Sequence, residues 1–281
     1  MTASALEPIE VRKFDTIQTN PVYVLHGGPG GQGSAHGLAE LLSNNFRVVE
    51  PIQRASGSVR LTVDQHVRDL ADVLESPATL VGWSWGAMLA LSAAASRPEL
   101  ISGVVVIGCG TYDNNSRSIY NRALAGRLSP SHTDQLARLT RIAENASRGR
   151  DARNRAFAKC AQIIEECQSK VSAKYYMPIE VADKDGFDET WADVLRLQED
   201  DIEPQRFSQI VCPVRMIHGS EDPHPGRPTY ETLRQFIEDI EYHEIQGAGH
   251  KPWVESATRD LFQRKLVEHT TELLGSGLAA G

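Results

Sequence analysis

Residues 79–88 read Thr-Leu-Val-Gly-Trp-Ser-Trp-Gly-Ala-Met, and the rest of the chain is best interpreted from them. A short apolar run ends in Gly-x-Ser-x-Gly with Ser84 at its centre, and an alanine-rich helical segment follows over 85–95. A strand that turns sharply into a helix at such a serine is typical of a nucleophile elbow, which exposes the hydroxyl on a strained backbone. Gly82 and Gly86 suit a turn that is too tight for larger side chains. We therefore predict that Ser84 is a nucleophile.

Strand and helix patterns alternate on both sides of this stretch. Apolar, β-branched runs predict strands at 9–14, 21–25, 46–50, 103–107, 213–218 and 240–245. Helical patterns are expected at 34–42, 62–74, 85–95, 227–237 and 256–273, the first capped by Ser34 and the second by Thr62. This alternation predicts an α/β protein with a mostly parallel, doubly wound sheet.

The alternation is interrupted between residues 112 and 205. Apolar residues recur there at helical spacing, as at Leu136, Leu139 and Ile142, and strand signals are scarce. We therefore expect a helical cap over 112–205, inserted into a core made of residues 1–111 and 206–281.

Composition excludes several classes of protein. Of the 281 residues, 41% are hydrophobic and 23% charged, and the formal net charge of −8 argues against a nucleic-acid partner. No apolar run approaches the ~20 residues that a membrane span needs. Residues 1–8 lack the basic and apolar segments of a signal peptide, so a cytoplasmic location is expected.

The four cysteines fit that location. Cys160 and Cys167 would lie two turns apart on one helix, roughly 10 Å, which is too far for a disulfide. Cys109 and Cys212 are isolated in the sequence, and no spacing among the four suits a zinc site. We expect reduced cysteines within the protein interior.

A serine nucleophile needs a base and a group that orients the base, and the chain has candidates for both. Asp222 follows the strand at 213–218, and His250 lies in a glycine-flanked loop after the next strand. The carboxyl ends of parallel strands meet at one sheet edge, and the order Ser, Asp, His is that of one known triad arrangement. We predict Ser84, Asp222 and His250 as catalytic residues, with Glu221 as the rival to Asp222.

Acyl transfer also needs donors for the developing oxyanion. The backbone N–H of Trp85 is one candidate because it opens the helix after the nucleophile. The other is Gly28, in the glycine-rich stretch 26–31 after a strand. That stretch lacks the Gly-Lys-Ser/Thr and Gly-x-Gly-x-x-Gly patterns of nucleotide-binding loops.

The other histidines in these turns have simpler interpretations. His26 is expected to be structural, His218 to be a core histidine with satisfied hydrogen bonds, and His224 to be a loop residue. No cluster in the sequence has metal-ligand spacing, so neither a metal nor another cofactor is expected.

Two motifs together resemble a known family. His26-Gly27-Gly28-Pro29-Gly30 and Gly82-Trp83-Ser84-Trp85-Gly86 are similar to the His-Gly-Gly-Pro-Gly loop and Gly-Gly-Ser-Trp-Gly elbow of the proline iminopeptidases. These enzymes are a branch of the α/β-hydrolase superfamily. The turn at 53–58 resembles their Asp-Gln-Arg-Gly-x-Gly-x-Ser motif, although Ile52 replaces the aspartate and Ala55 the first glycine.

The resemblance implies an α/β-hydrolase fold with an inserted helical cap, and release of N-terminal proline from peptides. In that family, acidic cap residues bind the free amine of the substrate. The acidic cap residues here include Glu165, Glu166, Glu180 and Asp183, and none aligns with the family's amine-binding carboxylates. We interpret them as belonging to solvated helix faces.

The substrate class stays open between several reactions. A small amide or short peptide is the first hypothesis, and an ester, lactone or thioester of a small metabolite is nearly level with it. Hydrolysis of a carbon–carbon bond comes third, and a non-catalytic ligand receptor last. Substrate-binding candidates are Trp83, Trp191 and Tyr176. The sequence leaves the oligomeric state undetermined.

Overall fold

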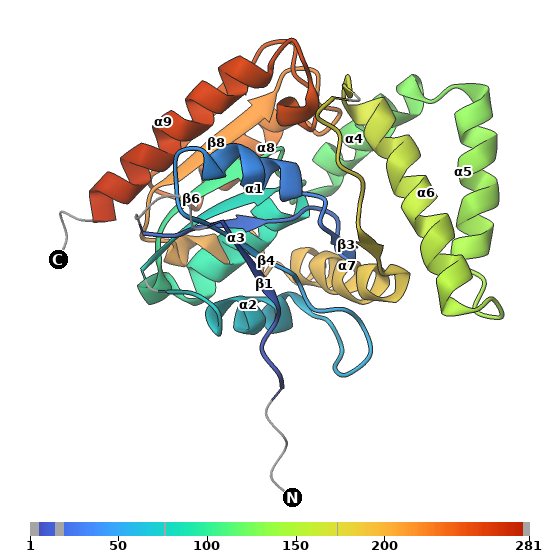
Figure 1. Ribbon diagram of the computed structural model, residues 1–281, viewed down its shortest axis with the longest axis horizontal. Helices are drawn as coiled ribbons and strands as arrows, with labels where there is room; N and C mark the ends of the chain where they lie inside the picture. Colours follow the sequence, from blue (N-terminus) through green and yellow to red (C-terminus); the bar gives the residue numbers. More distant parts are fainter. Residues whose placement is uncertain (1–5, 15–19, 76, 173, 278–281) are drawn as a thin grey trace, which may run out of the picture.

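The computed structural model describes residues 6–14, 20–75, 77–172 and 174–277, so the first five residues of the N-terminal segment discussed above lie outside it. A seven-stranded sheet forms its centre, in the order β1-β4-β2-β5-β6-β8-β9. All neighbouring strands pair in parallel except β1, which is antiparallel to β4 at one edge. The predicted α/β fold with a mostly parallel sheet is confirmed (Figure 1).

The sheet strands lie close to their predicted ranges. They are β1 (Val11–Phe14), β2 (Val22–Leu25), β4 (Val48–Pro51), β5 (Ala78–Trp83), β6 (Ile101–Ile107), β8 (Val214–Gly219) and β9 (Ile240–Ile245). Every residue of β2, β5 and β8 is buried, because these central strands are covered on both faces.

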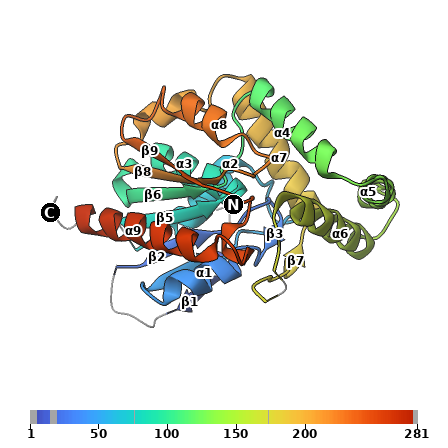
Figure 2. The ribbon, with the colours of Figure 1, turned by 90° about the horizontal axis from the view of Figure 1, so that it is seen from above.

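Helices cover both faces of the sheet, as Figure 2 shows. One face is covered by α1 (His36–Ser43) and α9 (Arg259–Gly277), and the other by α2 (Val63–Ala71), α3 (Trp85–Ser96) and α8 (Gly226–Leu233). Two apolar cores result. Leu38 and Phe262 belong to the first, and Val67 and Leu89 to the second. Helix α3 is buried along almost its whole length, which explains its uniformly apolar sequence.

Two of the predicted helix starts are wrong. Helix α1 begins at His36 rather than at Ser34, whose hydroxyl instead donates to the carbonyl of Gly27 at 3.3 Å. Residues 252–254 form a short 3-10 helix (η3, Pro252–Val254), so α9 starts only at Arg259. Helix α2 is capped as predicted, since Thr62 Oγ1 accepts from the backbone N–H of Gln65 at 3.1 Å.

The segment between β6 and β8 is mainly helical and lies at one end of the sheet (Figure 2). It contains α4 (Asn114–Arg127), α5 (Pro130–Ala143), α6 (Arg150–Gln168) and α7 (Lys184–Glu199), and then a 3-10 helix, η2 (Gln205–Gln209). The division into core and cap at 112 and 205 remains our interpretation of this arrangement.

A small second sheet joins this segment to the glycine-rich loop, and the sequence pattern missed it. Strand β3 (Gly31–Gln32) pairs antiparallel with β7 (Val181–Ala182). Two-residue strands carry no periodicity that a sequence pattern could reveal.

Within the described residues, no helix has the length and apolar character to cross a membrane.

Candidate active site

Ser84 occupies a strained position between β5 and α3. Its φ of 56° and ψ of −117° lie outside the regions that a serine normally adopts. The turn is as tight as expected, since a Cβ on Gly82 would lie 2.2 Å from the carbonyl oxygen of Gly86. A Cβ on Gly86 would lie 2.3 Å from the carbonyl oxygen of Leu25. Only glycine therefore fits at both positions.

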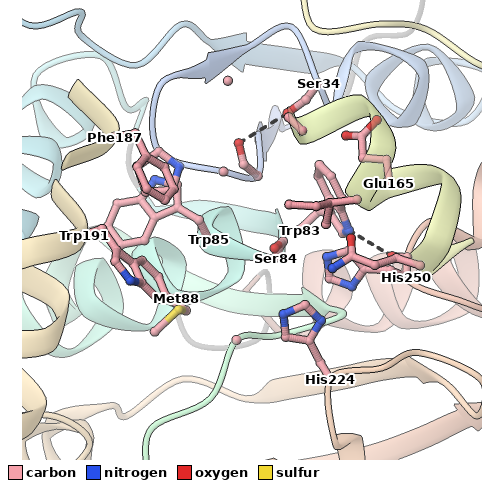
Figure 3. Close-up of a pocket in the computed structure, with 18 of the residues that line it drawn as sticks. Ser34, Trp83, Ser84, Trp85, Met88, Glu165, Phe187, Trp191, His224 and His250 are labelled. Atoms are coloured by element: carbon pink, nitrogen blue, oxygen red, sulfur yellow. Dashed lines mark hydrogen bonds between the residues drawn. The ribbon is translucent and has the colours of Figure 1, made fainter. Parts of the chain in front are cut away.

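Asp222 and His250 meet as predicted, although 28 residues separate them. Asp222 follows β8, His250 follows β9, and His250 Nδ1 lies 2.7 Å from Asp222 Oδ2. The His250 loop is held on both sides: its N–H donates to Gln168 at 3.0 Å, and its carbonyl accepts from Trp83 Nε1 at 2.9 Å. Ser84 and His250 line the same cavity (Figure 3).

Glu221, the rival to Asp222, points elsewhere. Its carboxylate is exposed and lies 2.6 Å from Lys170 Nζ. The Asp222 side chain is completely buried. The structure therefore brings Asp222, and not its neighbour, to the imidazole of His250.

His218 and His224 also contact Asp222, and the sequence did not predict these contacts. The backbone N–H and the Nδ1 of His224 lie 2.8 and 3.0 Å from Asp222 Oδ1. His218 Nε2 lies 3.3 Å from Asp222 Oδ2, and its Nδ1 has no hydrogen-bond partner among the described residues, so its bonds are not all satisfied. His224 lies in a loop, as predicted. The sequence signal for its contact with Asp222 is the Asp-x-His spacing within one turn.

The ring of His224 packs directly on His250. The two rings stack with centroids 4.4 Å apart, and Tyr120 stacks on the other side of His224 at 4.2 Å. His224 also lines the cavity, so the base is supported from the cavity side by two rings.

Burial and charge set the protonation states of the pair. Burial lowers the pKa of His250 to about 4, although the Asp222 carboxylate raises it. Burial opposes ionisation of Asp222, but its electrostatic interactions with His250 and His218 and its hydrogen bonds with His224 bring its pKa well below the usual value. Near neutral pH the imidazole is therefore neutral, as a general base must be, beside an ionised carboxylate.

The two predicted oxyanion donors lie at the expected places. Gly28, with a φ of 48°, and Trp85, the first residue of α3, both line the cavity. Gln53 connects their segments, because its side chain accepts from Trp85 Nε1 at 2.8 Å and donates to the carbonyl of His26 at 3.1 Å. His26 is buried, and its Nδ1 donates to the carbonyl of Gly27 at 3.0 Å, in keeping with a structural role.

The cavity has a volume of about 400 Å³ and a largely apolar wall. Trp85, Met88, Phe187 and Trp191 lie on one side of Ser84, and Trp83 and His250 on the other (Figure 3). Trp83 and Trp191 are therefore placed as the sequence analysis expected. Tyr176 is not among the described residues that line the cavity, and its hydroxyl donates to Glu165 Oε2 at 3.2 Å.

Glu165 forms a buried ion pair at the edge of this cavity, so its interpretation as a solvated residue is wrong. Its Oε1 lies 2.5 Å from Lys251 Nζ, and both side chains are buried. Lys251 directly follows His250, and its ammonium also lies 4.5 Å from the ring centroid of Trp83. The pair joins α6 to the loop that carries His250 across 86 residues of sequence.

The other acidic cap residues divide into two groups. Asp183 is buried and accepts from the backbone N–H and the hydroxyl of Ser56, so it too is not solvated. Glu180 is exposed and pairs with Arg12, and Glu166 is exposed and accepts from Gln162.

Removing the cation of the buried pair should destabilise the protein. In Lys251→Met the Glu165 carboxylate keeps only the Tyr176 hydroxyl, and breaking a buried pair in this way costs about 3–5 kcal/mol. The double variant Lys251→Met/Glu165→Gln should recover much of this loss because no buried charge remains. Urea unfolding measures both values, and equal losses in the single and double variants would contradict the expectation.

One cluster within the described residues has metal-ligand geometry, although no sequence spacing predicts it. Ligand atoms of Asp222, His224 and His250 lie within 4.8 Å of one another. The Nδ1 atoms of both histidines already lie at hydrogen-bond distance from Asp222. The expectation that the site needs no metal stays a prediction.

Comparisons with solved structures agree with this fold. The chain resembles VinJ (19% identity, TM-score 0.61, 94% of each chain covered) and an esterase from Thermogutta terrifontis (20%, 0.61, 94% of each). It also resembles the proline iminopeptidase of Mycobacterium smegmatis (18%, 0.58, 96% of each). At such identities the likeness concerns the fold alone. No curated protein matches the chain significantly in sequence.

A family model assigns the chain to a protein family, which the likeness to these structures alone does not do. The model of the alpha/beta hydrolase family matches residues 22–264, which include the Ser84 elbow and the loops of Asp222 and His250. This match spans well over half of the chain, and the sheet order and strand directions agree with it. The chain therefore belongs to the alpha/beta hydrolase family.

Proposed function

We propose that this protein is a serine hydrolase that acts on a small substrate through an acyl-enzyme. The proposal rests chiefly on one observation: the 2.7 Å contact between His250 and Asp222 lies beside a cavity that Ser84 also lines. A serine hydroxyl becomes a useful nucleophile only beside such an oriented base.

The proposed reaction has two halves. Ser84 Oγ attacks the substrate carbonyl while His250 Nε2 takes the hydroxyl proton, and Asp222 stabilises the imidazolium that forms. His250 then gives this proton to the leaving group, and the acyl group stays on Ser84. In the second half, His250 removes a proton from water, which attacks the acyl-enzyme and releases the acid.

Two backbone donors complete the proposed site. The N–H groups of Gly28 and Trp85 are assigned to the oxyanion of the tetrahedral intermediate. In the described part of the chain, neither group donates to a backbone carbonyl. Trp85 also opens α3, where the helix dipole favours negative charge. Gln53 bonds to both segments and is proposed to position these donors.

Esters, lactones or thioesters are the better-supported substrates. The cavity is small and mostly apolar, and the one carboxylate among its described lining residues, Glu165, is already paired with Lys251. A peptide with a free N-terminal amine would need an unpaired carboxylate.

The His-Gly-Gly-Pro-Gly loop at 26–30 is the observation that favours the second candidate, a prolyl aminopeptidase. The structural neighbours include a meta-cleavage product hydrolase and an enol-lactonase, so carbon–carbon bond hydrolysis comes third.

Two chromogenic substrates test this assignment. We expect kcat/KM for p-nitrophenyl butyrate to exceed that for proline p-nitroanilide by at least about tenfold, since an unpaired buried charge costs more than 1.4 kcal/mol. Both activities should be measured beside Ser84→Ala. Faster hydrolysis of the anilide would favour the aminopeptidase. A folded protein that hydrolyses neither and resists a fluorophosphonate would instead be a ligand receptor.

A further inference from the structure

Two residues in the cavity wall have a guanidinium or carboxylate side chain. Among the described lining residues these are Arg117 and Glu165, the histidines aside. The charge of Glu165 is balanced by Lys251, with 2.5 Å between the charged atoms. The question is therefore which groups surround the charge of Arg117.

Among the described residues, the side-chain hydrogen bonds of Arg117 go to neutral groups. It lies in the first turns of α4, where Nη1 donates to Asn114 Oδ1 at 3.1 Å and Nη2 donates to Gln198 Oε1. The Gln198 amide is fixed in turn, because its Nε2 donates to the carbonyl of Thr111 at 3.0 Å. These contacts hold the guanidinium in place and leave its charge uncompensated.

No carboxylate in the described chain lies within 4.0 Å of this guanidinium. The acid closest in sequence, Asp113, accepts from the N–H and hydroxyl of Ser116, both at 2.7 Å. Arg117 Nε is buried and without a hydrogen-bond partner among the described residues. A buried, unpartnered N–H of a charged group is costly, so the described protein groups do not fully satisfy this guanidinium.

We infer that the cavity binds a ligand with a carboxylate, which Arg117 recognises through its Nη hydrogens. Under the proposed function this ligand is the substrate, so the inference names the substrate class: an ester, lactone or thioester that also carries an acid group. A guanidinium suits a carboxylate because both are planar and pair through two parallel hydrogen bonds.

Arg117 and the residues beside His250 belong to the same cavity wall. Arg117 and Tyr120 are three residues apart on α4 and so lie on one face of the helix. Tyr120 stacks on His224, which stacks on His250. Arg117, Ser84 and His250 all line the cavity. Under the proposal, the carboxylate at Arg117 and the scissile carbonyl at Ser84 are therefore separate groups of one substrate.

A binding measurement tests the inference without requiring turnover. The Ser84→Ala protein is titrated by calorimetry with 5-phenylpentanoate and with 5-phenylpentanamide, its neutral isostere. We expect the acid to bind about 10- to 100-fold more tightly, as a charge-assisted hydrogen bond would give. Adding Arg117→Gln should remove this preference, and Arg117→Lys should keep part of it.

A matched control lies on the same helix. Arg122 of α4 is exposed and does not line the cavity, so Arg122→Gln in the same background should keep the full preference. Equal binding of acid and amide, no detectable binding of either, or a preference that survives Arg117→Gln would each overturn the inference. Arg117→Lys keeps the test decisive if the glutamine variant does not fold.

Kinetics with the active protein separate this inference from the proposed function. The mono-p-nitrophenyl ester of adipic acid is compared with the corresponding ester of adipamic acid. Arg117→Gln should lower kcat/KM for the acid about 10- to 100-fold and leave that for the amide nearly unchanged. An acid preference in binding without any hydrolysis would refute the hydrolase and keep the carboxylate site. Hydrolysis of both esters at equal rates would support the hydrolase and refute the carboxylate site.

Discussion

Replacing Ser84 by alanine is expected to lower kcat for an ester substrate by about 10⁴- to 10⁶-fold. The change removes the oxygen atom that is proposed to form the acyl-enzyme and leaves the cavity, the His250–Asp222 pair and the proposed oxyanion donors intact. Alanine keeps the Cβ at a φ of 56°, so the backbone strain of the elbow is unchanged. The free energy of unfolding should therefore change little.

Ser34 provides the matched control for that variant. It is a second serine in the wall of the same cavity, and its hydroxyl donates to the Gly27 carbonyl at 3.3 Å. Ser34→Ala should lower kcat by no more than about tenfold, the value of one neutral hydrogen bond. Steady-state rates and fluorophosphonate labelling measure both variants. Comparable losses in the two, or labelling that persists in Ser84→Ala, would show that Ser84 is not the nucleophile.

Asp222→Asn is expected to lower kcat by about 10⁴-fold, the loss found when a triad aspartate is made neutral. The carboxylate accepts from His250 Nδ1–H and so leaves Nε2 free to take a proton. An amide in its place can donate to Nδ1, which moves the ring proton to Nε2, where the base is blocked. His218 and His224 would also lose the charge that they face.

Glu221→Gln is the control, because the sequence left these two adjacent acids as rivals. Glu221 is exposed and pairs with Lys170, and a surface ion pair of this kind contributes little to stability. Its loss should leave kcat within about twofold and lower stability only slightly. A large loss of kcat in Glu221→Gln, with activity retained in Asp222→Asn, would reverse the assignment.

The sheet and the main outline of the site were predictable because each rests on a local pattern. In the strand–turn–helix at 79–88, Gly82 and Gly86 already indicate from the sequence that the backbone turns tightly and is strained at Ser84. Asp222 and His250 follow two strands, and parallel strands bring such positions to one edge whatever the loops contain. The alternation of strands and helices is likewise a property of short segments, so the α/β fold followed from it.

The contacts that characterise the cavity wall were not predictable in this way. His224 was interpreted as a loop residue, yet it stacks on His250. Glu165 was assigned to a solvated face, yet it is buried against Lys251. Arg117 carried no signal, because an arginine among polar residues in a helix has the pattern of an exposed surface.

The nucleophile elbow and the strand ends are thus encoded within short stretches of the chain, where neighbouring residues impose the geometry directly. The partners of a charged side chain depend on which helix packs over the sheet edge, and at what rotation. Helix α6 brings Glu165 to Lys251, whereas α4 places Arg117 beside neutral groups. Charge compensation is a property of such contacts between distant segments, and it therefore became visible only in the folded protein.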